Sequence, residues 1–164
     1  METYALTNCI LLDGTQTMQP QKSMAILVRE GRIENIVPQA AVPKGYPLRD
    51  LDGQYVLPGL INLHVHLAGS GKPKKKQTDP VKAMKLVTAN ALTRKVGMSM
   101  VEGFAKEQLL SGVTTIRTVG GILDFDARLR DEINAGRKTG PRILAGNMAI
   151  SVPGGHMAGS LAYT

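Results

Sequence analysis

From residue 57 onward, short apolar segments typical of strands alternate with longer segments typical of helices. The expected strands cover about residues 57–67, 113–119 and 142–147, and the expected helices about residues 80–96, 99–111 and 125–135. This alternation indicates βαβ units, in which helices connect the parallel strands of one sheet. We therefore expect an α/β fold here, with its chemistry at the carboxyl ends of the strands.

Local signals set the expected ends of these helices. Asp79 is a good N-cap residue and Pro80 suits the first helical position, whereas Gly97 is expected to end the first helix. Asp124 and Asp126 lie at the start of the third helix, where carboxylates interact favourably with the helix dipole. We interpret these two acids as capping residues rather than catalytic ones.

The first strand carries two of the three histidines in the chain near its carboxyl end. Side chains alternate along a strand, so Asn62, His64 and His66 share one face and the apolar residues share the other. Two neutral imidazoles that converge on one point are good zinc ligands. The spacing alone leaves open whether they bind metal or line the polar side of an amphipathic strand. His156 follows the third strand, so all three histidines are expected on one rim, which favours a site.

Residues 3–56 are predicted to be all-β. Strands are expected near residues 4–12, 24–28 and 32–37, with a tight hairpin at Glu30-Gly31, because glycine readily adopts a positive φ. A further turn and strand follow near residues 50–56. These are too few strands for a stable sandwich, so the layer is expected to be completed from elsewhere.

The chain has a formal net charge of +7, and much of the surplus lies between Lys72 and Lys76. We interpret this run as a solvated loop rather than a nucleic-acid site, because no aromatic residues alternate with the lysines. No apolar run reaches the ~18 residues of a membrane span. Cys9 is the single cysteine, which fits a reducing compartment. The N-terminus lacks the basic region of a signal peptide. We therefore expect a cytoplasmic protein with neither a nucleic-acid nor a membrane partner.

Three segments together resemble one known family. They are residues 57–66 with the two histidines, residues 111–117 with the second strand, and residues 140–156 with the third strand and its loop. In this combination the chain resembles the N-terminal portion of the amidohydrolase superfamily, in the branch of imidazolonepropionase and the Xaa-Pro dipeptidases. One departure is that relatives often carry Asp where this chain has Thr118.

The resemblance implies a partial (β/α)8 TIM-type barrel over residues 57–164, of about three strands. It also implies that residues 1–56 form the N-terminal part of a composite β-sandwich. His64 and His66 would bind one of one or two divalent ions, usually zinc, and His156 would lie near the substrate. The family's carboxylated lysine, further histidines and general-base aspartate have no counterpart up to Thr164, so no catalytic residue is assigned.

The resemblance predicts that the intact protein hydrolyses a C–N bond, in a small amide, cyclic amide or dipeptide, with metal-activated water. Three strands cannot close a barrel, so the chain is expected to be a piece of a longer enzyme. It should associate with the rest of the barrel or form a homo-oligomer. Two alternatives stay open: a non-catalytic fragment or interaction piece with an incomplete metal site, and a basic nucleic-acid-binding module.

Overall fold

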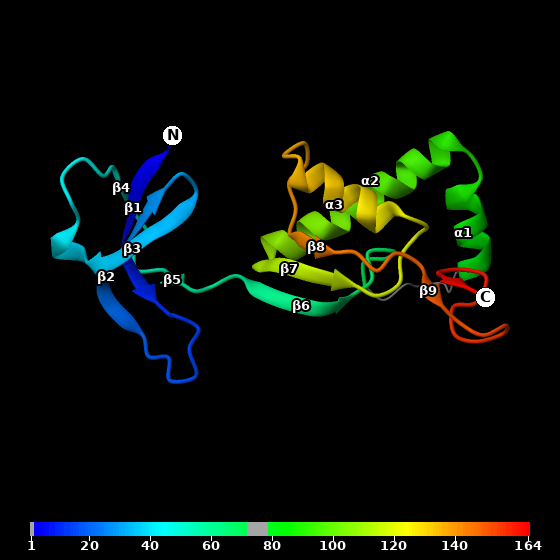
Figure 1. The fold of residues 1–164 in the computed structure, drawn as a ribbon, viewed down its shortest axis with the longest axis horizontal. Coiled ribbons are helices and arrows are strands. Elements are labelled where there is room, and N and C mark those ends of the chain that lie inside the picture. Colours follow the sequence, from blue (N-terminus) through cyan, green and yellow to red (C-terminus); the bar gives the residue numbers. More distant parts are fainter. Residues whose placement is uncertain (1, 72–78) are drawn as a thin grey trace. The chain divides into compact units, whose positions relative to one another are not determined.

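The computed structural model describes residues 2–71 and 79–164, and the chain forms two compact units, Met1–Pro58 and Gly59–Thr164. Figure 1 shows an all-β N-terminal unit and a second unit with three α-helices. The predicted basic loop between Lys72 and Lys76 lies outside the described residues.

A twisted sheet forms the first unit. Its strands are β1 (Thr3–Leu11), β2 (Gln21–Arg29), β3 (Arg32–Pro38), β4 (Leu48–Asp50) and β5 (Tyr55–Val56), with a 3-10 turn η1 (Gln39–Ala41) after β3. The order is β3-β2-β1-β4, and β5 also pairs with β1. The predicted hairpin is confirmed: Glu30 and Gly31 have φ values of 54° and 72° between the paired residues Arg29 and Arg32. Two consecutive positive φ angles are the geometry of a type I′ turn.

A bulge in β1 determines which side chains enter the core of this unit. Asn8 has a φ of 51°, and the pairing of β1 with β2 shifts between Leu6 and Cys9. The extra residue reverses the alternation of side chains, so that Leu6 and Leu11 face the same small cluster. Ile26, Val28, Val56 and Tyr4 belong to the same cluster.

The second unit contains a parallel sheet with the order β6-β7-β8. Its strands are β6 (Leu60–Val65), β7 (Val113–Thr118) and β8 (Arg142–Leu144), and its helices are α1 (Pro80–Thr88), α2 (Ala91–Leu110) and α3 (Phe125–Asn134). The predicted alternation of parallel strands and helices is confirmed. A short parallel pair, β9 (Ala149–Ile150) with β10 (Ala162–Tyr163), was not predicted.

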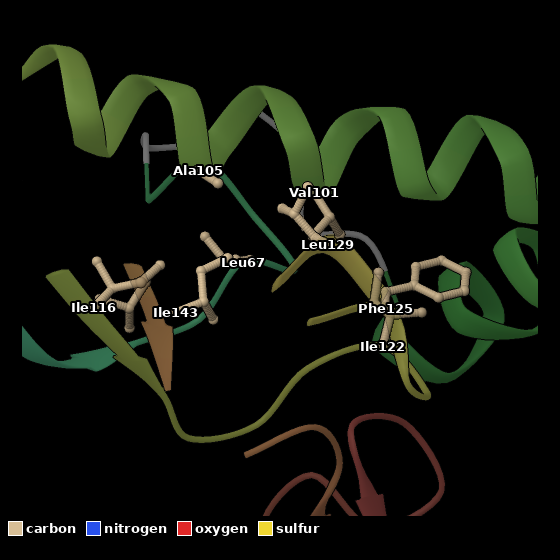
Figure 2. Packing of buried hydrophobic residues seen from close by; sticks show 9 residues of the cluster. Leu67, Val101, Ala105, Ile116, Ile122, Phe125, Leu129 and Ile143 are labelled. Carbon is tan, nitrogen blue, oxygen red and sulfur yellow. The ribbon is translucent and has the colours of Figure 1, made fainter. Parts of the chain in front are cut away.

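Buried apolar side chains from the sheet and the helices form the core of the second unit (Figure 2). Ile116 on β7 is 0% exposed and lies in one cluster with Val101 of α2 and Leu129 of α3. On β6 only the carboxyl end is covered: Val65 is buried, whereas Ile61 is 64% exposed. The predicted apolar face of that strand is therefore buried over only part of its length.

The predicted helix end at Gly97 is wrong. Helix α1 ends at Thr88, and Asn90 begins α2 with a capping box to Thr93. Gly97 lies inside α2, where an added Cβ would be 2.4 Å from Val87 Cγ1 and 3.1 Å from the Phe125 ring. The glycine therefore allows close packing of α1 and α3 on α2 rather than terminating a helix. By contrast, the predicted cap is confirmed: the Asp79 carboxylate accepts hydrogen bonds from two backbone amides of α1.

Leu92 falls within the helix expected over residues 80–96, but it lies on α2 and is 73% exposed. The break between the helices at residues 89–90 puts it out of register with the residues of α1. None of the helices within residues 2–71 and 79–164 has both the length and the apolar composition needed to cross a membrane.

Candidate metal centre

His64 and His66 lie at the carboxyl end of β6, the position that the sequence predicted. His64 is in the strand and His66 follows its last residue, and their ring centroids are 5.2 Å apart with the ring planes at 70°. When two imidazoles bind the same tetrahedral zinc ion with Zn–N distances of about 2.0–2.1 Å, their ring centroids lie roughly 5 Å apart. The separation of the two rings therefore fits a shared metal ion.

A backbone carbonyl fixes the His66 ring. Nδ1 of His66 lies 3.0 Å from the carbonyl oxygen of Gly120, in the loop after β7. Because a carbonyl oxygen only accepts hydrogen bonds, Nδ1 carries the proton and donates it. In the neutral imidazole the other nitrogen, Nε2, then has a free lone pair for a metal, as is usual when the second ring nitrogen has a hydrogen-bonding partner.

The loop that supplies this carbonyl requires glycine. Gly120 has a φ of 134°, which L residues with a side chain rarely adopt. An added Cβ at this position would also lie 3.3 Å from His66 Nδ1. Gly120 therefore contacts the candidate ligand directly.

Asp126 is a buried acid that the sequence interpretation missed. It lies in the first turn of α3 but is 0% exposed, and neither carboxyl oxygen has a hydrogen-bond partner among the described residues. Burial raises the pKa of its carboxyl group. The Thr118 hydroxyl and the His66 ring lower the pKa of Asp126 and so partly offset this rise. The Thr118 hydroxyl nevertheless lies outside hydrogen-bonding geometry with both carboxyl oxygens of Asp126.

Asp124 occupies the N-cap position of α3 and Asp126 lies in its first turn, as predicted, but neither carboxylate forms a capping hydrogen bond. The Asp124 side chain makes no capping hydrogen bond, and its Oδ2 instead lies 2.7 Å from Nε of Arg128 on the surface. Acids at a helix start usually face solvent, so the sequence contained no direct signal for the burial of Asp126. Gly121 was the available hint, because a residue without a side chain leaves room beside α3 for the carboxyl group of Asp126.

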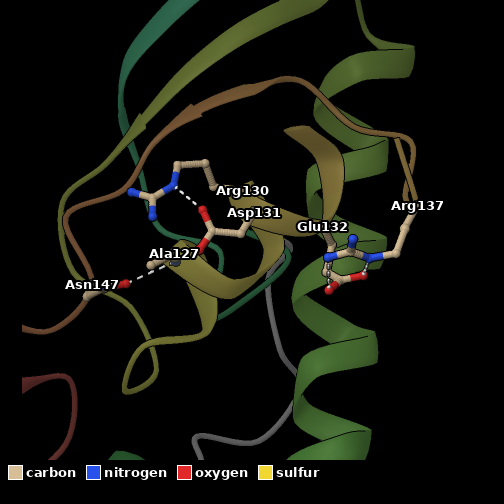
Figure 3. A network of polar contacts seen from close by, with 6 residues as sticks. All are labelled: Ala127, Arg130, Asp131, Glu132, Arg137 and Asn147. Atoms are coloured by element: carbon tan, nitrogen blue, oxygen red, sulfur yellow. Dashed lines mark hydrogen bonds and ion pairs between the residues drawn. The ribbon is translucent and has the colours of Figure 1, made fainter. Parts of the chain in front are cut away.

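Polar contacts join the loops that follow the three strands. The Thr118 hydroxyl accepts a hydrogen bond from the Gly146 amide at 3.0 Å. Asn147 Oδ1 accepts one from the Ala127 amide of α3 at 3.1 Å (Figure 3). Across the strands, Nε of Arg117 donates to the Leu63 carbonyl at 2.8 Å. These bonds hold the carboxyl ends of β6, β7 and β8 together as one edge.

His156 lies in the loop between β9 and β10 and is exposed. Within residues 2–71 and 79–164, no group of three or more His, Cys, Asp or Glu side chains gathers at one point, so His156 does not complete a ligand set with His64 and His66. Its role toward the substrate stays a prediction. The two imidazoles are fewer than the three or four protein ligands of a usual zinc site.

Comparison with known proteins decides the family. Residues 55–162 match the amidohydrolase family, and residues 3–56 match the composite domain of NagA. This chain belongs to the amidohydrolase family. The predicted resemblance to the N-terminal portion of this superfamily is thus confirmed.

The curated relatives of this amidohydrolase include imidazolonepropionase of Salmonella typhi, which is 42% identical over 64 residues; the match covers 34% of this chain and 16% of the relative. Among solved structures, a Bifidobacterium longum protein assigned as a prolidase is 34% identical, with a TM-score of 0.74 over 99% of this chain and 34% of its own. A Xaa-Pro dipeptidase with bound methionine is 26% identical, with a TM-score of 0.69 over 92% of this chain and 34% of its own. The chain therefore spans about a third or less of the length of these proteins.

Proposed function

We propose that this chain forms the first part of a metal-dependent hydrolase that cleaves C–N bonds. The observation that carries the proposal is the His64–His66 pair at the carboxyl end of β6, with Nδ1 of His66 engaged by Gly120 and Nε2 left for a metal. Membership in the amidohydrolase family supports the reaction class.

We propose in addition that β6, β7 and β8 are the first three strands of a (β/α)8 barrel and that residues 1–56 contribute to a β-sandwich. Two observations support this architecture. The solved prolidase-like structure superimposes on 99% of the chain, and Ile61 and Leu63 are exposed on β6. Further strands and helices of a longer protein, or a second copy of the chain, would cover these side chains.

The residues of this chain have distinct roles in the proposed reaction. A bound divalent ion such as zinc supplies a Lewis acid and a water whose pKa is lowered to about 7. His64 and His66 would hold this ion through neutral imidazole nitrogens, and the Gly120 carbonyl favours the tautomer of His66 with the proton on Nδ1. His156 is proposed to hold the substrate from the loop after β9. The remaining ligands and the general base are expected outside this chain.

Among C–N substrates, we favour Xaa-Pro dipeptides over cyclic amides. Two solved structures related to proline-dipeptide cleavage, the prolidase-like protein and the Xaa-Pro dipeptidase, superimpose on 99% and 92% of this chain. Substrate choice in barrel enzymes depends on loops from several strands, so a match that includes the loops after β7 and β8 is the more informative one.

The experiment is a hydrolysis assay on the full-length protein with a panel of Xaa-Pro dipeptides and imidazolonepropionate. Activity should disappear after chelation and return when zinc is added. His64→Ala and His66→Ala should each lower the bound metal and abolish turnover, while circular dichroism shows an intact fold. Unchanged metal content in both variants would contradict the ligand assignment. Metal binding without turnover of any substrate would instead support the non-catalytic alternative.

A further inference from the structure

Two consecutive glycines lie beside two groups of interest: Gly120 beside the candidate ligand His66 and Gly121 beside the buried acid Asp126. A Cβ on Gly120 would lie 3.3 Å from His66 Nδ1, and a Cβ on Gly121 would lie 2.4 Å from Asp126 Oδ2. The imidazole and the carboxyl group therefore pack against neighbouring Cα atoms of the same loop. Gly121 does not have a positive φ, so the space taken by Asp126, rather than backbone conformation, explains why a side chain is excluded there.

The peptide group between these glycines is held at both ends. Its carbonyl, from Gly120, accepts the hydrogen bond of His66 Nδ1 at 3.0 Å. Its amide, from Gly121, donates to the carbonyl of Asn147 at 2.7 Å. A chain of hydrogen bonds polarises its members and strengthens each of them. The orientation of the His66 ring thus depends on the position of this one peptide.

Helix α3 fixes that peptide from the side. The Asp126 carboxyl group packs against Gly121, and the next residue, Ala127, donates its amide to the side chain of Asn147. Asn147 therefore binds the peptide through its backbone and the helix through its side chain. A movement of the Asp126 side chain would shift the carbonyl that holds His66.

An unpartnered buried carboxyl group is costly for the fold. Leaving a buried polar group without a hydrogen bond costs about 1–3 kcal/mol, and more when the group is charged. A negative charge close to a metal ligand raises the affinity of a site for a cation, because the interaction is strong where water is excluded. Asp126 has this location: it is 0% exposed, and its carboxyl group packs on Gly121, whose peptide bond with Gly120 holds the His66 ring.

We propose that Asp126 is a positioning residue for the metal site, which holds His66 in its metal-binding orientation through the Gly120-Gly121 peptide and strengthens metal binding with its charge. This inference rests on the proposed function, in which His66 is a ligand. Asp126 is not proposed as a ligand itself, because it is 0% exposed and its carboxyl group packs on Gly121.

The test is Asp126→Asn in the full-length protein, with zinc affinity measured by chelator competition. The amide has nearly the shape of the carboxylate but no charge. Zinc affinity should fall by about 10- to 100-fold, the usual effect of changing a group that supports a ligand. At the same time the melting temperature of the metal-free protein should stay the same or rise, which a purely structural role would not produce. Asp124→Asn, two residues away on the surface, is the matched control and should leave the affinity unchanged.

Gly121→Ala gives a second, independent reading. The new methyl group would overlap the Asp126 carboxyl group, so it should displace the peptide and lower zinc affinity as well. In ¹⁵N NMR spectra of the metal-free protein, His66 should be protonated at Nδ1 in the wild type and should show mixed tautomers in Gly121→Ala.

Wild-type zinc affinity in Asp126→Asn would overturn the inference. If His66→Ala loses zinc while Asp126→Asn keeps it, the metal site stands and only the role of Asp126 fails. If His66→Ala also keeps its zinc, the proposed function itself is wrong.

Discussion

Glu34 in the first unit and Asp126 in the second are acids in opposite surroundings. Glu34 is on the surface, where the Tyr46 hydroxyl and the Arg29 guanidinium lower its pKa. Asp126 is buried and unpartnered, and burial raises its pKa. In the first unit the charge of Glu34 is paired at the surface, where water also solvates it. In the second unit the carboxyl group of Asp126 is buried without a partner near a candidate metal ligand, which lowers the stability of the fold. Such an unfavourable arrangement persists where function requires it.

The largest expected contrast between the units concerns their isoleucines. Ile116→Ala, at a 0% exposed position of the second unit, should lower the free energy of unfolding by about 2–5 kcal/mol through lost burial and a cavity. Ile33→Ala in the first unit, where the side chain is 65% exposed, should change it by less than about 0.5 kcal/mol. Urea denaturation measures both. Equal losses would contradict the burial described here.

Two glycines of one helix test the packing of α1 and α3 on α2. Gly97→Ala would place a methyl group 2.4 Å from Val87, so it should destabilise by about 1–3 kcal/mol despite the better helix propensity of alanine. Gly103→Ala has open space and should stabilise by up to about 1 kcal/mol. Thermal melts of the two variants should therefore shift in opposite directions, and a stabilised Gly97→Ala would show that the helices pack less closely.

Removing the charge of Asp126 and removing the charge of Glu34 should have different effects on the melting temperature. In metal-free protein at neutral pH, Asp126→Asn should raise the melting temperature, because a buried unpartnered charge is removed. Glu34→Gln should lower it slightly or not at all, since exposed ion pairs contribute little. A clear loss of stability in Asp126→Asn would mean that the carboxylate has a stabilising partner.

The sign of the pH dependence follows from the same difference. The pKa of Asp126 is raised in the folded protein, so the folded state binds more protons than the unfolded one between the unfolded and the folded pKa. Its unfavourable contribution to the free energy of unfolding should therefore grow as the pH rises through that range. The stability advantage of Asp126→Asn over the wild type should be larger at pH 7 than at pH 4, as measured by chemical denaturation at both values. An advantage independent of pH would show that the carboxyl titrates normally.

Sequence patterns predicted those features that depend on local chemistry. The period-two pattern around His64 and His66, the Asp79 cap and the Glu30-Gly31 turn each report on a few adjacent residues, and the structure confirms the cap and the turn. Gly97 and Asp126 were misread because their roles depend on other elements that pack against them. For the glycine these are Val87 of α1 and Phe125 of α3, and for the acid it is Gly121 in the loop after β7. The sequence around a glycine or around an acid at a helix start looks the same whether or not another element packs against that residue.

The most direct test of the central claim is a crystal structure of the full-length protein with zinc, with anomalous diffraction recorded at the zinc edge. We predict a zinc peak about 2.0–2.1 Å from a nitrogen of His64 and from Nε2 of His66, with His66 Nδ1 still bonded to the Gly120 carbonyl. A zinc site elsewhere, or zinc bound through His66 Nδ1 with the Gly120 hydrogen bond broken, would contradict the account.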